Sequence, residues 1–109
     1  MSMPNVSEET QTKIEAAAFR RMLEHLDERK DVQNIDLMNL AGFCRNCLWK
    51  WYSAEAKKHD DSFDNATAQH YVYGMALADW KRDYQTEASD EQKQLFESSR
   101  DKHAKITGY

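Results

Sequence analysis

Residues 42–52 read GFCRNCLWKWY, and this stretch sets the interpretation of the whole chain. It carries both cysteines of the chain, Cys44 and Cys47, in a CxxC spacing among aromatic residues. The apolar pattern around it continues from Leu37 to about Lys58, which predicts one continuous helix. At about 100° per residue, one face of that helix holds Leu37, Leu40, Ala41, Cys44, Leu48, Trp51 and Tyr52. Cys44 is therefore predicted to point into the core, and Trp49 to point away from it.

Three more segments show helical periodicity, each after a good N-cap residue. The expected helices follow Ser7, Asp64 and Ser89, and the last begins with the capping-box pattern of Ser89 and Gln92. Gly74 lies in the middle of the third helix and could interrupt it. No segment alternates with a period of two, so the fold class is all-α: a compact bundle of about four helices. A single domain over residues 1–109 is expected, with 1–7 and 106–109 frayed.

Composition excludes several classes of protein. Three glycines and one proline in 109 residues favour long helices with few turns. No apolar run is long enough for a membrane span, and no signal peptide is visible, so we expect a cytoplasmic protein that does not bind membranes. The net charge of −4 argues against a nucleic-acid partner. Short basic pairs such as Lys57-Lys58 lie near acidic residues and are expected on solvated helix faces.

The CxxC spacing is open to three interpretations. The favoured one is packing, because cysteine is a small, readily buried residue. The alternative is zinc held by Cys44, Cys47 and His25, since residues three apart on a helix are neighbours and His25 lies near the end of the preceding helix. Otherwise no cofactor is predicted. Thiol chemistry is the third, but a redox pair of this kind places its first cysteine at a helix N-terminus, and Cys44 is predicted to lie about two turns inside a helix.

Two further groups of residues are candidates for function. Aromatic residues outside the predicted core faces, including Trp49 and Tyr71, predict a homodimer with two-fold symmetry. A polar cluster flanks the thiols and consists of Gln33, Asn34, Asp36, Asn39, Arg45 and Asn46. Hydrogen bonding that holds the first two helices together is the favoured role for this cluster, ahead of ligand binding. An interaction or regulatory module fits these features better than an enzyme, and the identity of any other protein partner is left open.

The block DVQNIDLMNLAGFCRNC, with EAAAFRR before it and VYGM after it, resembles a family of short bacterial proteins. This family is catalogued as domain of unknown function 1244, and the resemblance covers roughly residues 15–92. It implies a compact, dimeric four-helix subunit in a bacterial cytoplasm, and it implies no activity. The chain departs from the family at Ala76, where the family commonly has proline, and at His70, where an acidic residue is common.

Overall fold

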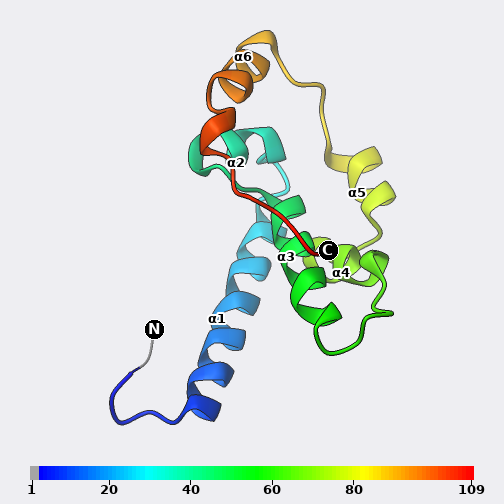
Figure 1. Ribbon diagram of the computed structural model, residues 1–109. Coiled ribbons are helices and arrows are strands. Elements are labelled where there is room, and N and C mark those ends of the chain that lie inside the picture. The colour runs from blue at the N-terminus through cyan, green and yellow to red at the C-terminus, as the bar shows by residue number, and fades with distance from the viewer. Residues whose placement is uncertain (1–2) are drawn as a thin grey trace.

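The computed structural model describes residues 3–109, and within them all regular secondary structure is helical, without strands. Figure 1 shows the helices α1 (Glu8–Glu28), α2 (Asn34–Ala41), α3 (Arg45–Lys57), α4 (Asn65–Tyr73), α5 (Leu77–Tyr84) and α6 (Asp90–Ser98). A short 3₁₀ turn, Arg100–Lys102, follows α6. The expected frayed segment 1–7 falls partly on Met1 and Ser2, which lie outside the described residues. None of the helices within residues 3–109 combines the length and apolar character needed to cross a membrane.

The predicted N-caps form as expected. The side chain of Ser7 accepts a hydrogen bond from the Thr10 backbone, and that of Asp64 accepts one from Ala66. Ser89 and Gln92 make both hydrogen bonds of the capping box. These side chains fix where α1, α4 and α6 begin, because each satisfies a backbone N–H that the first helical turn leaves without a partner.

The continuous helix predicted for residues 37–58 is wrong. Gly42 takes a left-handed conformation (φ 77°) and ends α2, and Cys44 is the N-cap of α3. Gly74 (φ 72°) ends α4 in the same way, and α5 begins at Leu77. Six α-helices therefore occupy residues 3–109 instead of about four, because two expected long helices are each represented by two short ones.

The break at Gly42 also changes which side chains of α3 are buried. Trp49, predicted to point away from the core, is only 6% exposed. Trp51 and Tyr52, predicted to be buried, are 38% and 37% exposed, and Leu40 on α2 is 85% exposed. In a continuous helix, each residue would follow the last by about 100°, and the buried face could be extrapolated from α2 to α3. The three-residue break between them interrupts this sequence of angles, so a different face of α3 is buried.

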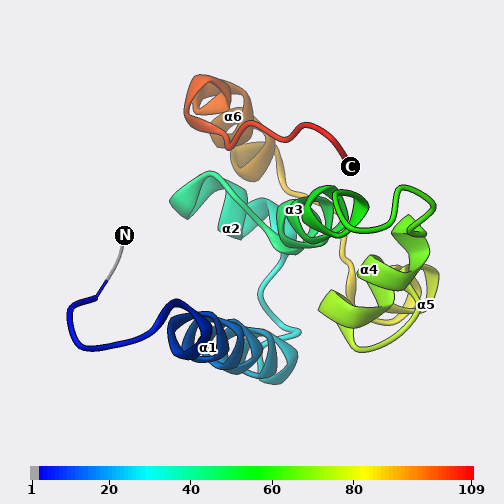
Figure 2. The ribbon, with the colours of Figure 1, turned by 60° about the horizontal axis from the view of Figure 1, so that its bottom comes forward.

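The core lies where α3 and α4 pack side by side, with α5 and the second half of α1 against them (Figure 2). Its buried apolar residues are Leu23, Leu48, Trp49, Ala68, Val72, Tyr73 and Trp80. The helix α6 packs on α2, away from this core. From α6 the chain returns across the molecule, where the Ala104 N–H donates to the Gly42 carbonyl (2.7 Å) and Tyr109 packs edge-on against Trp49.

Candidate functional site

Arg45 is the centre of the polar cluster predicted from the sequence. It is 2% exposed, and its guanidinium donates to the carbonyls of Arg29 (2.8 Å) and Val32 (2.8 Å) and to Oδ1 of Asn34 (3.1 Å). The group also stacks over the ring of Trp80, 5.0 Å from its centroid. Burial lowers the pKa of this guanidinium. Arg45 therefore joins the C-terminal end of α1, whose carbonyls carry partial negative charge, to the start of α2.

A second set of hydrogen bonds connects α2, α3 and α4. The hydroxyl of Tyr73 donates to Oδ1 of Asn46 (2.6 Å) and accepts from Nδ2 of Asn34 (3.0 Å). The indole N–H of Trp49 donates to the same oxygen of Asn46 (3.2 Å). Burial raises the pKa of the Tyr73 hydroxyl, which therefore stays protonated and acts as a donor. We name Asn34, Asn46, Trp49 and Tyr73 the amide network.

Removing the Tyr73 hydroxyl tests this network. We expect Tyr73→Phe to lower the free energy of unfolding by about 1–3 kcal/mol, because the half-buried Asn34 and Asn46 would each lose a hydrogen-bond partner. Urea unfolding followed by circular dichroism measures the change. Tyr84→Phe, a half-buried tyrosine outside the network, is the control and should cost less. Equal losses in the two variants would contradict a structural role for the network.

The remaining residues of the predicted cluster hold the segment after α5 and helix α6. Gln33 donates to the carbonyl of Tyr84 (2.9 Å) and accepts from the Thr86 N–H (3.0 Å). The side-chain amide of Gln92 donates to Oδ1 of Asp36 (2.8 Å), and its backbone carbonyl accepts from Nδ2 of Asn39 (3.1 Å). Arg45 and Asn34 thus have the role that the sequence favoured, which is to hold the first two helices together. Gln33, Asp36 and Asn39 instead bond to the segment after α5 and to α6.

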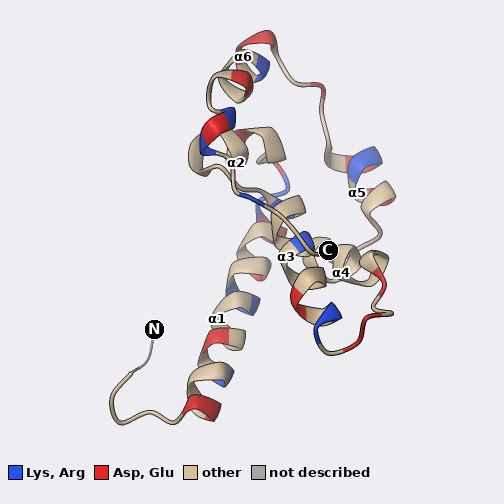
Figure 3. Cartoon of the chain, in the orientation of Figure 1, with Lys and Arg blue, Asp and Glu red and all other residues tan. Residues whose placement is uncertain are grey.

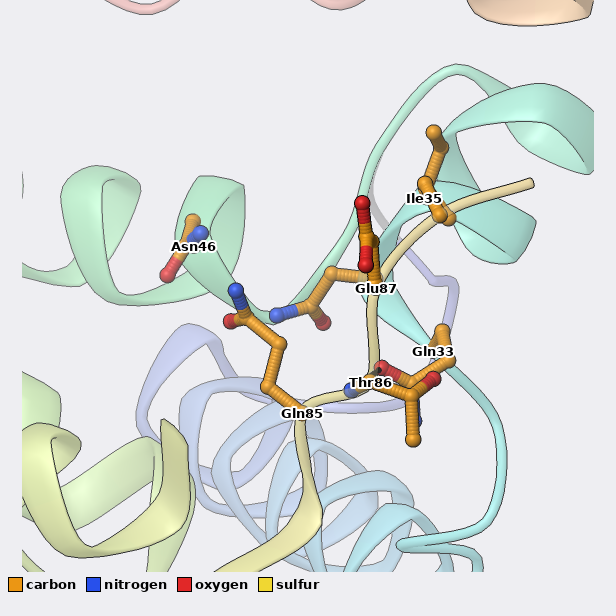
Figure 4. Close-up of a pocket in the computed structure, with 8 residues that line it drawn as sticks. Gln33, Ile35, Asn46, Gln85, Thr86 and Glu87 are labelled. Carbon is orange, nitrogen blue, oxygen red and sulfur yellow. Dashed lines mark hydrogen bonds between the residues drawn. The ribbon is translucent and has the colours of Figure 1, made fainter. Parts of the chain in front are cut away.

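A polar cavity of about 360 Å³ lies beside the amide network, between α2, α3 and the segment after α5. Figure 4 shows side chains of Asn46, Gln85 and Glu87 around it. Amide groups that both donate and accept suit a polar ligand better than an apolar one. Glu87 and Gln85 were not singled out from the sequence, because their position beside Asn46 depends on the path of the chain after α5.

The two thiols lie at the start of α3. Both cysteines are free and buried, with Cys44 as the N-cap and Cys47 in the first turn. The expectation that Cys44 lies two turns inside a helix is therefore wrong. Burial raises the pKa of the Cys44 thiol and outweighs the backbone N–H groups of Cys47 and Asn46, which lower it. The pair has the helix-terminal position of a redox motif, but burial keeps the Cys44 thiol neutral.

A third sulfur atom accompanies the thiols. Sδ of Met38, on α2, lies 3.9 Å from Sγ of Cys47. All three sulfur-bearing residues line one cavity of about 360 Å³, together with Lys50. We name Met38, Cys44 and Cys47 the sulfur cluster. Met38 was not expected beside the thiols, because the predicted continuous helix put it on a different side from Cys44.

The structure does not bring His25 to the thiols. His25 is exposed in the last turn of α1, and among residues 3–109 no three His, Cys, Asp or Glu side chains are grouped as they would be around one metal ion. Zinc binding by Cys44, Cys47 and His25 stays a prediction.

A row of aromatic rings forms a second candidate site, on the surface. Ring centroids are 6.5 Å apart for Phe19 and Tyr71, 4.8 Å for Tyr71 and Tyr52, and 6.0 Å for Tyr52 and Phe63. These residues, named the aromatic surface, come from α1, α3, α4 and the loop before α4. Trp49, expected in an exposed interface, is buried in the core instead.

Charges of both signs are interspersed along the helices, as Figure 3 shows for α1 and α6. In two of the short basic pairs a lysine contacts an acidic neighbour: Lys30 Nζ lies 2.8 Å from Asp27, and Lys58 Nζ 2.7 Å from Glu55. Such exposed pairs contribute little to stability. These pairs are therefore consistent with the solvated helix faces expected from the sequence.

Comparison with known proteins places the chain in a family. A search of curated proteins finds no match. A family match covers residues 32–98, which is more than half of the chain and includes the amide network and the sulfur cluster. The chain therefore belongs to the family described as "Protein of unknown function (DUF1244)".

Proposed function

We propose that the chain is an interaction module that forms a homodimer through the aromatic surface. The observation that carries this proposal is the partial exposure of connected rings from several helices. Tyr52 and Tyr71 are 37% and 38% exposed although their rings pack against each other. Aromatic residues are enriched where proteins meet, because a ring covers a large apolar area and loses little conformational freedom.

The first half of α1 supplies a second surface for this contact. In Figures 1 and 2 it projects away from the other helices, and Ile14 on it is 49% exposed. The radius of gyration is 15.7 Å, against about 13 Å for a typical domain of this length. In our proposal this half of α1 lies over the aromatic surface of a second copy. Two-fold symmetry would repeat the contact, so that both surfaces are covered in each copy.

A single charge on the projecting helix tests the proposal without touching the core. We expect the wild-type protein to sediment as a dimer at tens of micromolar, and Ile14→Glu to sediment as a monomer, because the interface would have to bury a carboxylate. Analytical ultracentrifugation measures both. Tyr71→Glu, on the aromatic surface, should act in the same direction, with circular dichroism verifying that it folds.

Leu40→Glu is the matched control. Leu40 is 85% exposed and lies on α2, which carries none of the rings of the aromatic surface, so this variant should remain a dimer. A monomeric wild-type protein at tens of micromolar would refute the proposal. A dimer that Leu40→Glu dissociates and Ile14→Glu does not would refute the location of the interface.

A further inference from the structure

The sulfur cluster combines residues from two helices that meet at the Gly42 break. Met38 approaches from α2, and Cys44 and Cys47 are three residues apart at the start of α3, where side chains are neighbours. We propose that Met38, Cys44 and Cys47 form a binding site for copper(I), with the two thiolates and the thioether as ligands. This proposal is independent of the homodimer.

The spacing of the Met38 and Cys47 sulfur atoms fits a shared ion. With metal–sulfur bonds of about 2.3 Å, as in zinc–thiolate sites, the sulfur atoms of a trigonal site are about 4 Å apart. The observed distance between Sδ of Met38 and Sγ of Cys47 is 3.9 Å. A metal ion could therefore bridge these atoms without a change in the positions of α2 and α3.

The donor set selects the kind of metal. The cavity at the sulfur cluster is lined by no carboxylate and no imidazole among the described residues, and its other polar side chains are those of Asn34, Asn46 and Lys50. Thiolate and thioether ligands are soft and favour copper(I), whereas magnesium and calcium require oxygen ligands. Structural zinc sites use four ligands, usually thiolates and imidazoles. Three sulfur atoms without a fourth such group therefore fit copper(I) better than zinc.

The charge around the cavity also suits this ion. Binding would release the two thiol protons, and copper(I) with two thiolates carries a net charge of −1. Lys50 lines the same cavity, and its ammonium group lies 5.6 Å from the ring centroid of Trp49 and 5.0 Å from that of Tyr109. This cation would partly offset the negative charge at the cavity.

Anaerobic titration of the reduced, full-length protein with copper(I) tests the site, with bicinchoninate as a coloured competitor for the metal. We expect one copper per chain, with X-ray absorption showing only sulfur neighbours in the first coordination shell. Met38→Leu, which keeps the side chain apolar and similar in size, should weaken binding about tenfold or more, because the loss of even an outer-shell partner commonly costs that much. Met75→Leu makes the same exchange outside the sulfur cluster and should bind as the wild type does.

Several results would overturn the proposal. One is a failure to compete with bicinchoninate, and another is an oxygen or nitrogen neighbour in the first shell. Equal affinities for Met38→Leu and Met75→Leu would show that the two thiols bind copper without the thioether. Displacement of copper(I) by an equal concentration of zinc would show that the donor set does not select the metal as argued.

Discussion

Arg45→Ala is expected to lower the free energy of unfolding by about 3 kcal/mol or more, at a fixed protein concentration. The guanidinium is 2% exposed and supplies donors to the carbonyls of Arg29 and Val32 and to the side chain of Asn34. An alanine would leave these acceptors in the interior without partners and would open a cavity beside Trp80. Since the whole domain is stabilised by only about 5–15 kcal/mol, this loss is a large fraction of the total.

Urea unfolding followed by tryptophan fluorescence and circular dichroism measures this loss. Arg82→Ala is the control, because Arg82 is exposed and pairs with Asp79 and Asp83 at the surface. Such surface pairs contribute about 0–1 kcal/mol. Arg45→Lys keeps the positive charge but has a single nitrogen donor group, so we expect it to lie between the wild type and Arg45→Ala. Equal losses for Arg45→Ala and Arg82→Ala would contradict the role of Arg45 as the link between α1 and α2.

The features that could be predicted from the sequence are those decided within a few residues of the chain. The caps at Ser7, Asp64 and Ser89 were predicted because each side chain bonds to a backbone N–H two or three residues later. The all-helical class was predicted from the periodicity of the apolar residues, which is also a property of neighbouring residues.

The break between α2 and α3 was missed because the sequence gives a weak signal for it. Cys44 is the N-cap of α3 without a side-chain capping hydrogen bond, and cysteine is not a favoured residue at this position. Gly42 lies within a pattern that otherwise continues with helical spacing. Once the break was missed, the rotational phase of α3 was wrong, and with it the burial of Trp49, Trp51 and Tyr52.

The candidate site was found as a set of residues but not as an arrangement. Gln33 and Asn39 were recognised as polar residues that need partners, yet their partners lie more than fifty residues further along the chain. Periodicity carries no information about such pairs. The sulfur cluster shows the same limit at shorter range, because Met38 reaches Cys47 only across the turn at Gly42.

Gly42→Ala is expected to destabilise the protein more than Gly74→Ala, by about 1–3 kcal/mol. Both glycines have a positive φ, 77° and 72°, so alanine is strained at either position by about 1–2 kcal/mol. Only at Gly42 would the new methyl group meet backbone: a Cβ there would lie 2.5 Å from the carbonyl oxygen of Lys102, whereas at Gly74 the nearest atom is a side-chain oxygen of Asp27 at 3.4 Å. The difference between the two variants therefore measures the contact with the C-terminal segment, because the conformational strain is common to both.

Amide hydrogen exchange shows where Gly42→Ala destabilises the protein. The methyl group of Gly42→Ala would push residues 102–104 away from α2, and the hydrogen bond from the Ala104 N–H to the carbonyl of residue 42 would lengthen or break. We expect the Ala104 amide to exchange faster in Gly42→Ala than in Gly74→Ala under the same conditions. Equal unfolding free energies for the two variants, with an unchanged exchange rate at Ala104, would mean that the C-terminal segment adjusts without cost. In that case the close approach at Gly42 would not be what requires glycine there, and the positive φ that ends α2 would be sufficient to explain it.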